Sequence, residues 1–78
     1  MAKTKTARVS RGIVPGFVMD NIFNLATERM RKGLSRKDLA EMSGIPMARI
    51  TGYETGSIAV ARISYNKIAK VFEWQEWD

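Results

Sequence analysis

The 78-residue sequence predicts one small all-α domain of four to five short helices. Apolar residues recur at helical spacing in residues 18–32 and again in residues 61–72. Between these two segments, residues 33–56 (GLSRKDLAEMSGIPMARITGYETG) have the pattern of two short helices joined by a tight turn. Together the three segments predict a helix-turn-helix unit with a further helix on each side of it.

The first predicted helix covers residues 18–32 and ends at Gly33. The preceding segment, residues 12–17 (GIVPGF), either lies extended or begins the helix at Pro15, and the sequence leaves both options open. Four apolar residues of the helix fall at i, i+3, i+4 and i+8 and should face the core: Ile22, Leu25, Ala26 and Met30.

The first helix of the helix-turn-helix should begin after Ser35, whose hydroxyl can accept a hydrogen bond from a backbone N–H of the first turn. Asp38 follows three residues later and places a negative charge at the positive end of the helix dipole. Gly44 supplies the left-handed conformation with which a helix commonly ends. The apolar face of this helix is expected to consist of Leu39, Ala40 and Met42.

The second helix of the unit covers about residues 46–54. Pro46 stands at its start, where a missing backbone N–H costs nothing, and Gly56 follows its end. Ile50 and Tyr53 lie one helical turn apart, so we expect both to face the core.

A last helix is predicted from about residue 61 to residue 72, after a connector at residues 57–61 (SIAVA). The closing segment carries Trp74 and Trp77, which either cap the small core, form a dimer contact together with Phe72, or bind a partner protein. The apolar stripe of the last helix consists of Tyr65, Ile68, Ala69 and Phe72.

Charge is unevenly distributed along the chain, whose net charge is +5. Residues 1–17 hold four basic residues and no acidic one, whereas residues 71–78 hold three acidic residues and no basic one. This pattern favours a polyanionic partner. We interpret residues 1–17 as a flexible basic arm preceding a domain at residues 18–78; the alternative is a solvated leader without a role. The arm residues expected to follow phosphates or enter a minor groove are Lys3, Lys5, Arg8 and Arg11.

Composition excludes several classes of protein. Without Cys or His, the chain has no disulfides, no thiolate metal site and no histidine-based catalysis. Glu54 has no second positioned acid beside it and is expected to pair with a basic residue such as Arg29. No apolar run approaches the roughly 18 residues of a membrane span. We therefore expect a cytoplasmic protein that is not an enzyme and takes no cofactor.

A specific combination of motifs runs through the central segment: Leu-Ser-x-x-x-Leu-Ala, then Ser-Gly-Ile, then Tyr-Glu-x-Gly. With these residues the chain resembles the Cro/cI (XRE-type) helix-turn-helix family of small phage-repressor-like transcriptional regulators, over about residues 18–72. The resemblance implies a lambda-repressor-like fold whose helix at about 46–54 lies in the major groove of double-stranded DNA. The resemblance is carried by Gly33, Leu34, Ser35, Leu39, Ala40, Ser43, Gly44, Ile45, Ile50, Tyr53, Glu54 and Gly56.

The resemblance also implies which residues meet DNA. Arg49 is the one strong donor on the recognition helix, and we expect its loss to be the most damaging. Because its neighbours are poor in donors, DNA shape or the arm should contribute to specificity. The base-facing positions are Met47, Ala48, Arg49, Thr51 and Gly52, and the positions for phosphates or the groove edge are Ser35, Arg36, Lys37, Tyr53, Thr55 and Ser57.

Two functions of different classes are compatible with these residues. The leading hypothesis is a repressor or autorepressor that binds a two-fold operator as a homodimer, because a unit of this size makes few DNA contacts alone. The alternative is the antitoxin component of a toxin–antitoxin pair, which would bind a protein partner through the Trp-bearing tail and regulate its own operon.

Overall fold

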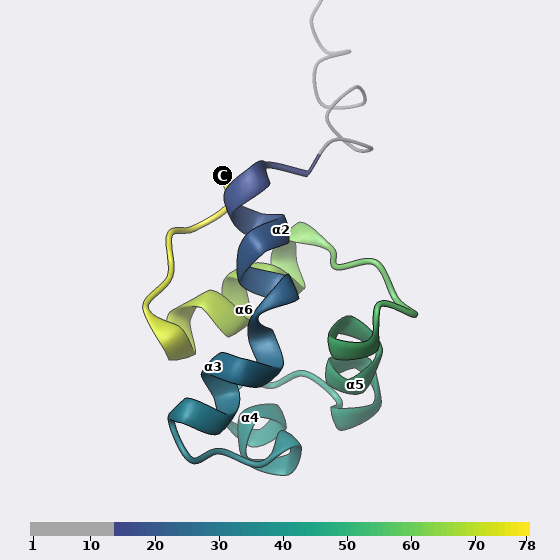
Figure 1. Cartoon of the computed structure of the whole chain (residues 1–78), viewed down its shortest axis with the longest axis vertical. Helices are drawn as coiled ribbons and strands as arrows, with labels where there is room; N and C mark the ends of the chain where they lie inside the picture. Colours follow the sequence, from purple (N-terminus) through teal and green to yellow (C-terminus); the bar gives the residue numbers. More distant parts are fainter. Residues whose placement is uncertain (1–13) are drawn as a thin grey trace, which may run out of the picture.

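The computed structural model describes residues 14–78, which form five helices and, within this range, no strand. The all-α prediction is confirmed. Figure 1 shows α4 and α5 at one end of the molecule and the start of α2 with the C-terminus at the other. The helices are α2 (Gly16–Phe23), α3 (Leu25–Arg31), α4 (Arg36–Ser43), α5 (Met47–Thr55) and α6 (Arg62–Phe72).

The first predicted helix is in fact two helices, because the regular helical conformation is interrupted at Asn24. The Asn24 side chain donates to the carbonyl oxygen of Asp20 (Nδ2–O 2.9 Å), the acceptor that its own backbone N–H also uses (N–O 3.1 Å). After the break, Arg29 points inward with a side chain only 11% exposed, and Met30 is 63% exposed. Placing Met30 on the apolar face was therefore wrong.

The folded part also begins earlier than residue 18. Pro15 caps α2, so the helix starts at Gly16, which settles the option that the sequence left open. Val14 and Phe17 pack against the buried cluster of Val18, Tyr65 and Ala69, so they belong to the domain rather than to the arm. The arm residues Lys3, Lys5, Arg8 and Arg11 lie outside the described residues.

Helix α4 begins and ends as its capping residues predict. The Ser35 hydroxyl accepts from the Asp38 backbone N–H (2.9 Å), and the Asp38 carboxylate accepts from the Ser35 backbone N–H (3.0 Å). These reciprocal bonds form a capping box. Gly44 ends the helix in the left-handed conformation, with φ of 77°.

One position on the predicted apolar face of α4 is wrong. Met42 is 58% exposed, and Ser43 is buried instead. The Ser43 hydroxyl is accommodated because it donates to the Leu39 carbonyl oxygen (2.7 Å) and accepts from the Ile45 backbone N–H (3.3 Å). A polar side chain can therefore occupy the inner side of the turn between the two helices.

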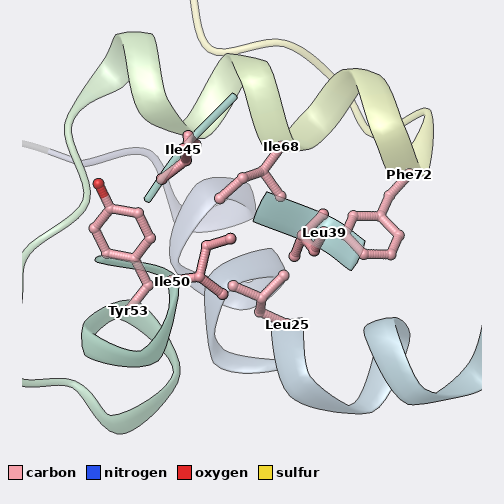
Figure 2. Packing of buried hydrophobic residues seen from close by; sticks show 7 residues of the cluster. All are labelled: Leu25, Leu39, Ile45, Ile50, Tyr53, Ile68 and Phe72. Atoms are coloured by element: carbon pink, nitrogen blue, oxygen red, sulfur yellow. The ribbon is translucent and has the colours of Figure 1, made fainter. Parts of the chain in front are cut away.

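The main core joins α3, α4, α5 and α6, and Figure 2 shows its side chains meeting between these helices. Burying each large apolar side chain contributes roughly 1.5–3 kcal/mol, so this cluster fixes how α4 and α5 sit on the rest of the domain. Its members are Leu25, Leu39, Ile45, Ile50, Tyr53, Ile68 and Phe72.

A second cluster forms around Tyr65, which is fully buried. Its hydroxyl accepts from the Asn21 side chain (2.9 Å) and donates to the Gln75 carbonyl oxygen (2.7 Å). Trp74 stacks on the Tyr65 ring at a centroid separation of 6.1 Å, and Trp77 meets it edge-on at 6.2 Å. Tyr65 thus links α2 to the C-terminal segment.

A second side chain of α6, Asn66, also fastens the closing segment. The Asn66 amide donates to the Trp77 carbonyl oxygen and accepts from the Trp77 backbone N–H, both at 2.8 Å. Trp74 also stacks on Phe72, with ring centroids 4.8 Å apart. Both tryptophans therefore cap the core, the first of the interpretations that the sequence offered.

Candidate DNA interface

Helix α5 presents an exposed face at its N-terminal half. Met47 is 50% exposed, Ala48 and Arg49 are exposed, and Thr51 is half-buried. The opposite side carries the buried Ile50 and Tyr53. Met47, Ala48 and Thr51 recur at i, i+1 and i+4, so they share the side of the helix that points away from the core.

Gly52 does not belong to this exposed face, contrary to the sequence-based prediction. The residue is buried, and the side chain of Ile58 lies directly against it. This contact has no signal in the sequence, because a glycine inside a helix and an isoleucine in the following connector do not form a recognised motif.

Arg49 lies at the edge of the exposed face, one helical turn before Tyr53. It forms no ion pair with any of the residues 14–78, unlike Arg29, Arg31 and Arg36. A long, unpaired guanidinium at such an edge can reach a base edge or a phosphate outside the domain.

The position of α5 is fixed by an ion-pair cluster between three helices. Glu54 of α5 accepts from Arg29 of α3 (Nε–Oε2 2.8 Å) and from Arg36 of α4 (Nε–Oε1 2.9 Å). Arg29 also donates to the Leu34 carbonyl oxygen (2.8 Å). The expected pairing of Glu54 with Arg29 is confirmed, and the cluster ties α5 to α3 and α4.

The Glu54 side chain is only 2% exposed, and its surroundings decide its charge state. Burial raises the pKa of Glu54, but the hydrogen bonds and positive charges of Arg29 and Arg36 together outweigh burial and hold this pKa below its ordinary value. The carboxylate therefore remains ionised at neutral pH, with its two oxygens satisfied by guanidinium donors.

Arg36 has a structural role that the sequence did not predict. Its Nε is bound to Glu54, while the side chain remains 41% exposed. An arginine has five N–H donors, so the remaining donors of its guanidinium can still bind an anion from outside. Pairing with Glu54 holds the exposed part in place next to the start of α4.

Ser35 and Lys37 also lie at the start of α4, and both are exposed. The Ser35 oxygen is occupied as an acceptor in the capping box, but its hydroxyl hydrogen can still be donated. Arg36 and Lys37 place two positive charges at the positive end of the α4 dipole. These charges do not stabilise the helix itself, but they suit an external anion.

Of the three predicted phosphate contacts at the end of α5, one is buried and two are exposed. Tyr53 is 4% exposed and belongs to the core, and in Figure 2 its hydroxyl points away from the centre of the cluster. Thr55 and Ser57 are exposed, and their hydroxyls are 3.1 Å apart across Gly56. The hydroxyls of this turn are therefore on the surface.

The candidate dimer contacts are largely used inside the domain. Phe72 is 8% exposed, and Trp74 and Trp77 are half-buried against Tyr65. The most exposed aromatic side chain in the described part is Phe23 at the end of α2, which is 89% exposed and was not singled out from the sequence.

A family model of the helix-turn-helix class matches residues 25–73. This range contains α3 to α6 and therefore the capped helix pair, the ion-pair cluster and the main core. The chain belongs to the XRE-type helix-turn-helix family. No match to a curated protein or to a solved structure was found.

Membership in this family makes the protein a DNA-binding transcriptional regulator, with α4 and α5 as its helix-turn-helix. Within residues 14–78, no helix has the length and apolar character that crossing a membrane demands, and no group of three or more acidic, Cys or His side chains could hold a metal ion.

Proposed function

We propose that the protein is a repressor that binds a two-fold DNA operator as a homodimer, with α5 in the major groove. The observation that carries this proposal is the exposed face of Met47, Ala48 and Thr51 on a helix whose other side is held in the core. A rigid helix with one free face is the form in which helix-turn-helix proteins read base edges.

Direct readout by this face is sparse in hydrogen-bond donors. Met47 and Ala48 offer apolar contact, for example with the methyl group of thymine, and Thr51 offers a hydroxyl and a methyl group. A bidentate contact with a base contributes about 1–3 kcal/mol of discrimination, and only Arg49 on α5 can make one. We infer that Arg49 carries most of the affinity of α5, and that DNA shape supplies further specificity.

Pairing of two subunits follows from this sparse readout. Helix-turn-helix dimers bind two half-sites about one helical turn of DNA apart, which doubles the number of contacts. A dimer that covers an operator within a promoter would repress by excluding polymerase.

The antitoxin alternative assigns the Trp-bearing tail to a toxin. The contacts of Trp74 and Trp77 with Tyr65, and of Trp77 with Asn66, give this tail a role within the domain. Because its aromatic surface is largely used there, we favour the repressor.

The experiment that tests the proposal uses the DNA upstream of the protein's own gene. A fluorescence-anisotropy titration of a duplex with an inverted repeat from this region should saturate at two protomers per duplex. A duplex of the same composition with one half-site scrambled should bind more weakly. Equal binding to both duplexes would contradict a two-fold, sequence-specific operator.

A further inference from the structure

Ile58 lies in the connector after α5, and its side chain packs on Gly52 within that helix. A Cβ added to Gly52 would lie 2.3 Å from Cδ1, 2.5 Å from Cγ1 and 2.9 Å from Cβ of Ile58. The Ile58 backbone N–H also donates to the Gly52 carbonyl oxygen, with an N–O distance of 3.2 Å. Only a residue without a side chain leaves room for this contact.

The contact closes a short turn at the end of α5. The Gly52 carbonyl oxygen accepts from the Ile58 N–H and also from the Thr55 hydroxyl (3.4 Å). Gly56 lies between them in the left-handed conformation (φ 82°), and the Thr55 and Ser57 hydroxyls are 3.1 Å apart. The Gly52 carbonyl oxygen therefore binds Thr55, the first residue of the turn at residues 55–57, and Ile58, the residue that follows it.

We propose that the packing of Ile58 on Gly52 sets the position of this turn on DNA, so that the Ser57 hydroxyl donates to a phosphate while the Thr55 hydroxyl keeps its single hydrogen on the Gly52 carbonyl oxygen. Gly52 and Ile58 are positioning residues in this arrangement, and neither contacts a base. The inference rests on the proposed placement of α5 in the major groove. Phosphate oxygens commonly accept hydrogen bonds from Ser and Thr side chains and from backbone N–H groups next to a DNA-reading helix.

The test is the variant G52A. Rotating the Ile58 side chain would move Cδ1 and Cγ1 away from the new methyl group, but the Ile58 Cβ at 2.9 Å is set by the backbone, so the turn itself must shift. Alanine favours the helix more than glycine does, so α5 should stay folded, as circular dichroism would verify. We expect the operator affinity to fall about tenfold, the equivalent of losing one hydrogen bond to a charged group.

Two further readouts separate a displaced turn from other causes. The lost donor is a neutral hydroxyl, so the slope of log affinity against log salt concentration should not change. Phosphate contacts carry no sequence information, so the ratio of affinities for the operator and for a scrambled duplex should also stay the same. A lower ratio would mean that the face of α5 had moved, which would overturn the inference.

Matched variants complete the experiment. G16A introduces the same change at the first residue of α2, where no atom lies within 4 Å of the new Cβ, and should bind as the wild type does. I58A should weaken binding in the same direction as G52A. The double variant should lose no more affinity than G52A alone because both changes act through one contact.

Wild-type affinity in G52A and I58A, with the wild type binding its operator, would overturn the inference and leave the proposed function standing. Losses that multiply in the double variant would also overturn it. A wild type that binds no DNA would contradict the proposed function itself.

Discussion

Arg29 and Glu54 form an ion pair between α3 and α5 in which the arginine side chain is 11% exposed and the glutamate side chain 2%. Their Nε–Oε2 distance is 2.8 Å, and a second nitrogen of the same guanidinium lies 3.3 Å from Oε1. This fork-like contact, together with Arg36 on the same carboxylate, determines how the recognition helix is held.

The first prediction concerns the stability that this pair contributes. R29A leaves a buried carboxylate with one partner fewer and an unbound Leu34 carbonyl oxygen, so we expect a loss of about 3 kcal/mol in the free energy of unfolding. The matched control is R31A, because Arg31 pairs with Glu28 while 70% exposed. This control should lose less than about 1 kcal/mol in a urea titration. Equal losses would contradict the structural role of Arg29.

The second prediction concerns pH. The pKa of Glu54 is lower in the folded than in the unfolded chain because the hydrogen bonds and charges of Arg29 and Arg36 outweigh the effect of burial. Its stabilising contribution is therefore complete above the ordinary glutamate pKa of about 4.3 and is lost as the pH falls through the lower, folded value.

E54Q removes this titrating group and keeps the side-chain shape. Urea titrations from pH 7 to pH 2.5 should show a steeper loss of stability for the wild type than for E54Q in the acid range. The residual slope of E54Q should include Asp38, whose pKa is lowered chiefly by the hydrogen bond from the Ser35 backbone N–H. Parallel curves for the two proteins would contradict the prediction.

The third prediction concerns the C-terminal segment. N66A removes two hydrogen bonds to the Trp77 backbone, so it should lower the free energy of unfolding by about 1–2 kcal/mol. The fluorescence of the two tryptophans should also shift to longer wavelength as this segment loosens from Tyr65. The control is K67A, which changes the residue after Asn66 in α6, where the side chain is exposed. This variant should leave both measurements unchanged.

The fourth prediction concerns the basic arm, whose structure lies outside the described residues. Deleting residues 2–11 removes four positive charges. If all four neutralise phosphates, the slope of log affinity against log salt concentration should become shallower by about 3.6. An unchanged slope would mean that the arm makes no contact with DNA.

Much of the fold could be predicted because local chemistry determines it. Ser35 with Asp38 and the left-handed Gly44 define the ends of α4 through bonds within a few residues, and these signals are written in the sequence. The apolar spacing of Ile50 and Tyr53 likewise identifies the inner side of α5. The helix ends, which depend on capping residues only a few positions apart, were therefore predicted correctly.

Apart from the pairing of Glu54 with Arg29, features that depend on contacts between distant residues could not be predicted in this way. The sequence did not indicate which polar side chain of α3 the interior would accept: Arg29 is 11% exposed beside Glu54, whereas Met30 is 63% exposed. The contact of Ile58 with Gly52 likewise arises only when the connector folds back on α5. Such contacts are set by tertiary packing, and helical periodicity alone carries no information about them.

The same limit applies to the candidate site. The exposed positions Met47, Ala48, Arg49 and Thr51 follow from helical spacing together with the family resemblance. The bond between Arg36 and Glu54, by contrast, joins residues 18 positions apart, and it makes Arg36 a structural residue as well as a candidate phosphate contact.

The central claim, that α5 binds the operator through Arg49, is tested most directly by R49A in an anisotropy titration of the operator duplex. Arg49 makes no ion pair among residues 14–78, so the variant should unfold at the same urea concentration as the wild type. We expect its operator affinity to fall more than tenfold, whereas K70A, which removes the same charge from α6, should change it far less. Unchanged affinity in R49A would contradict the assignment of α5 as the recognition helix.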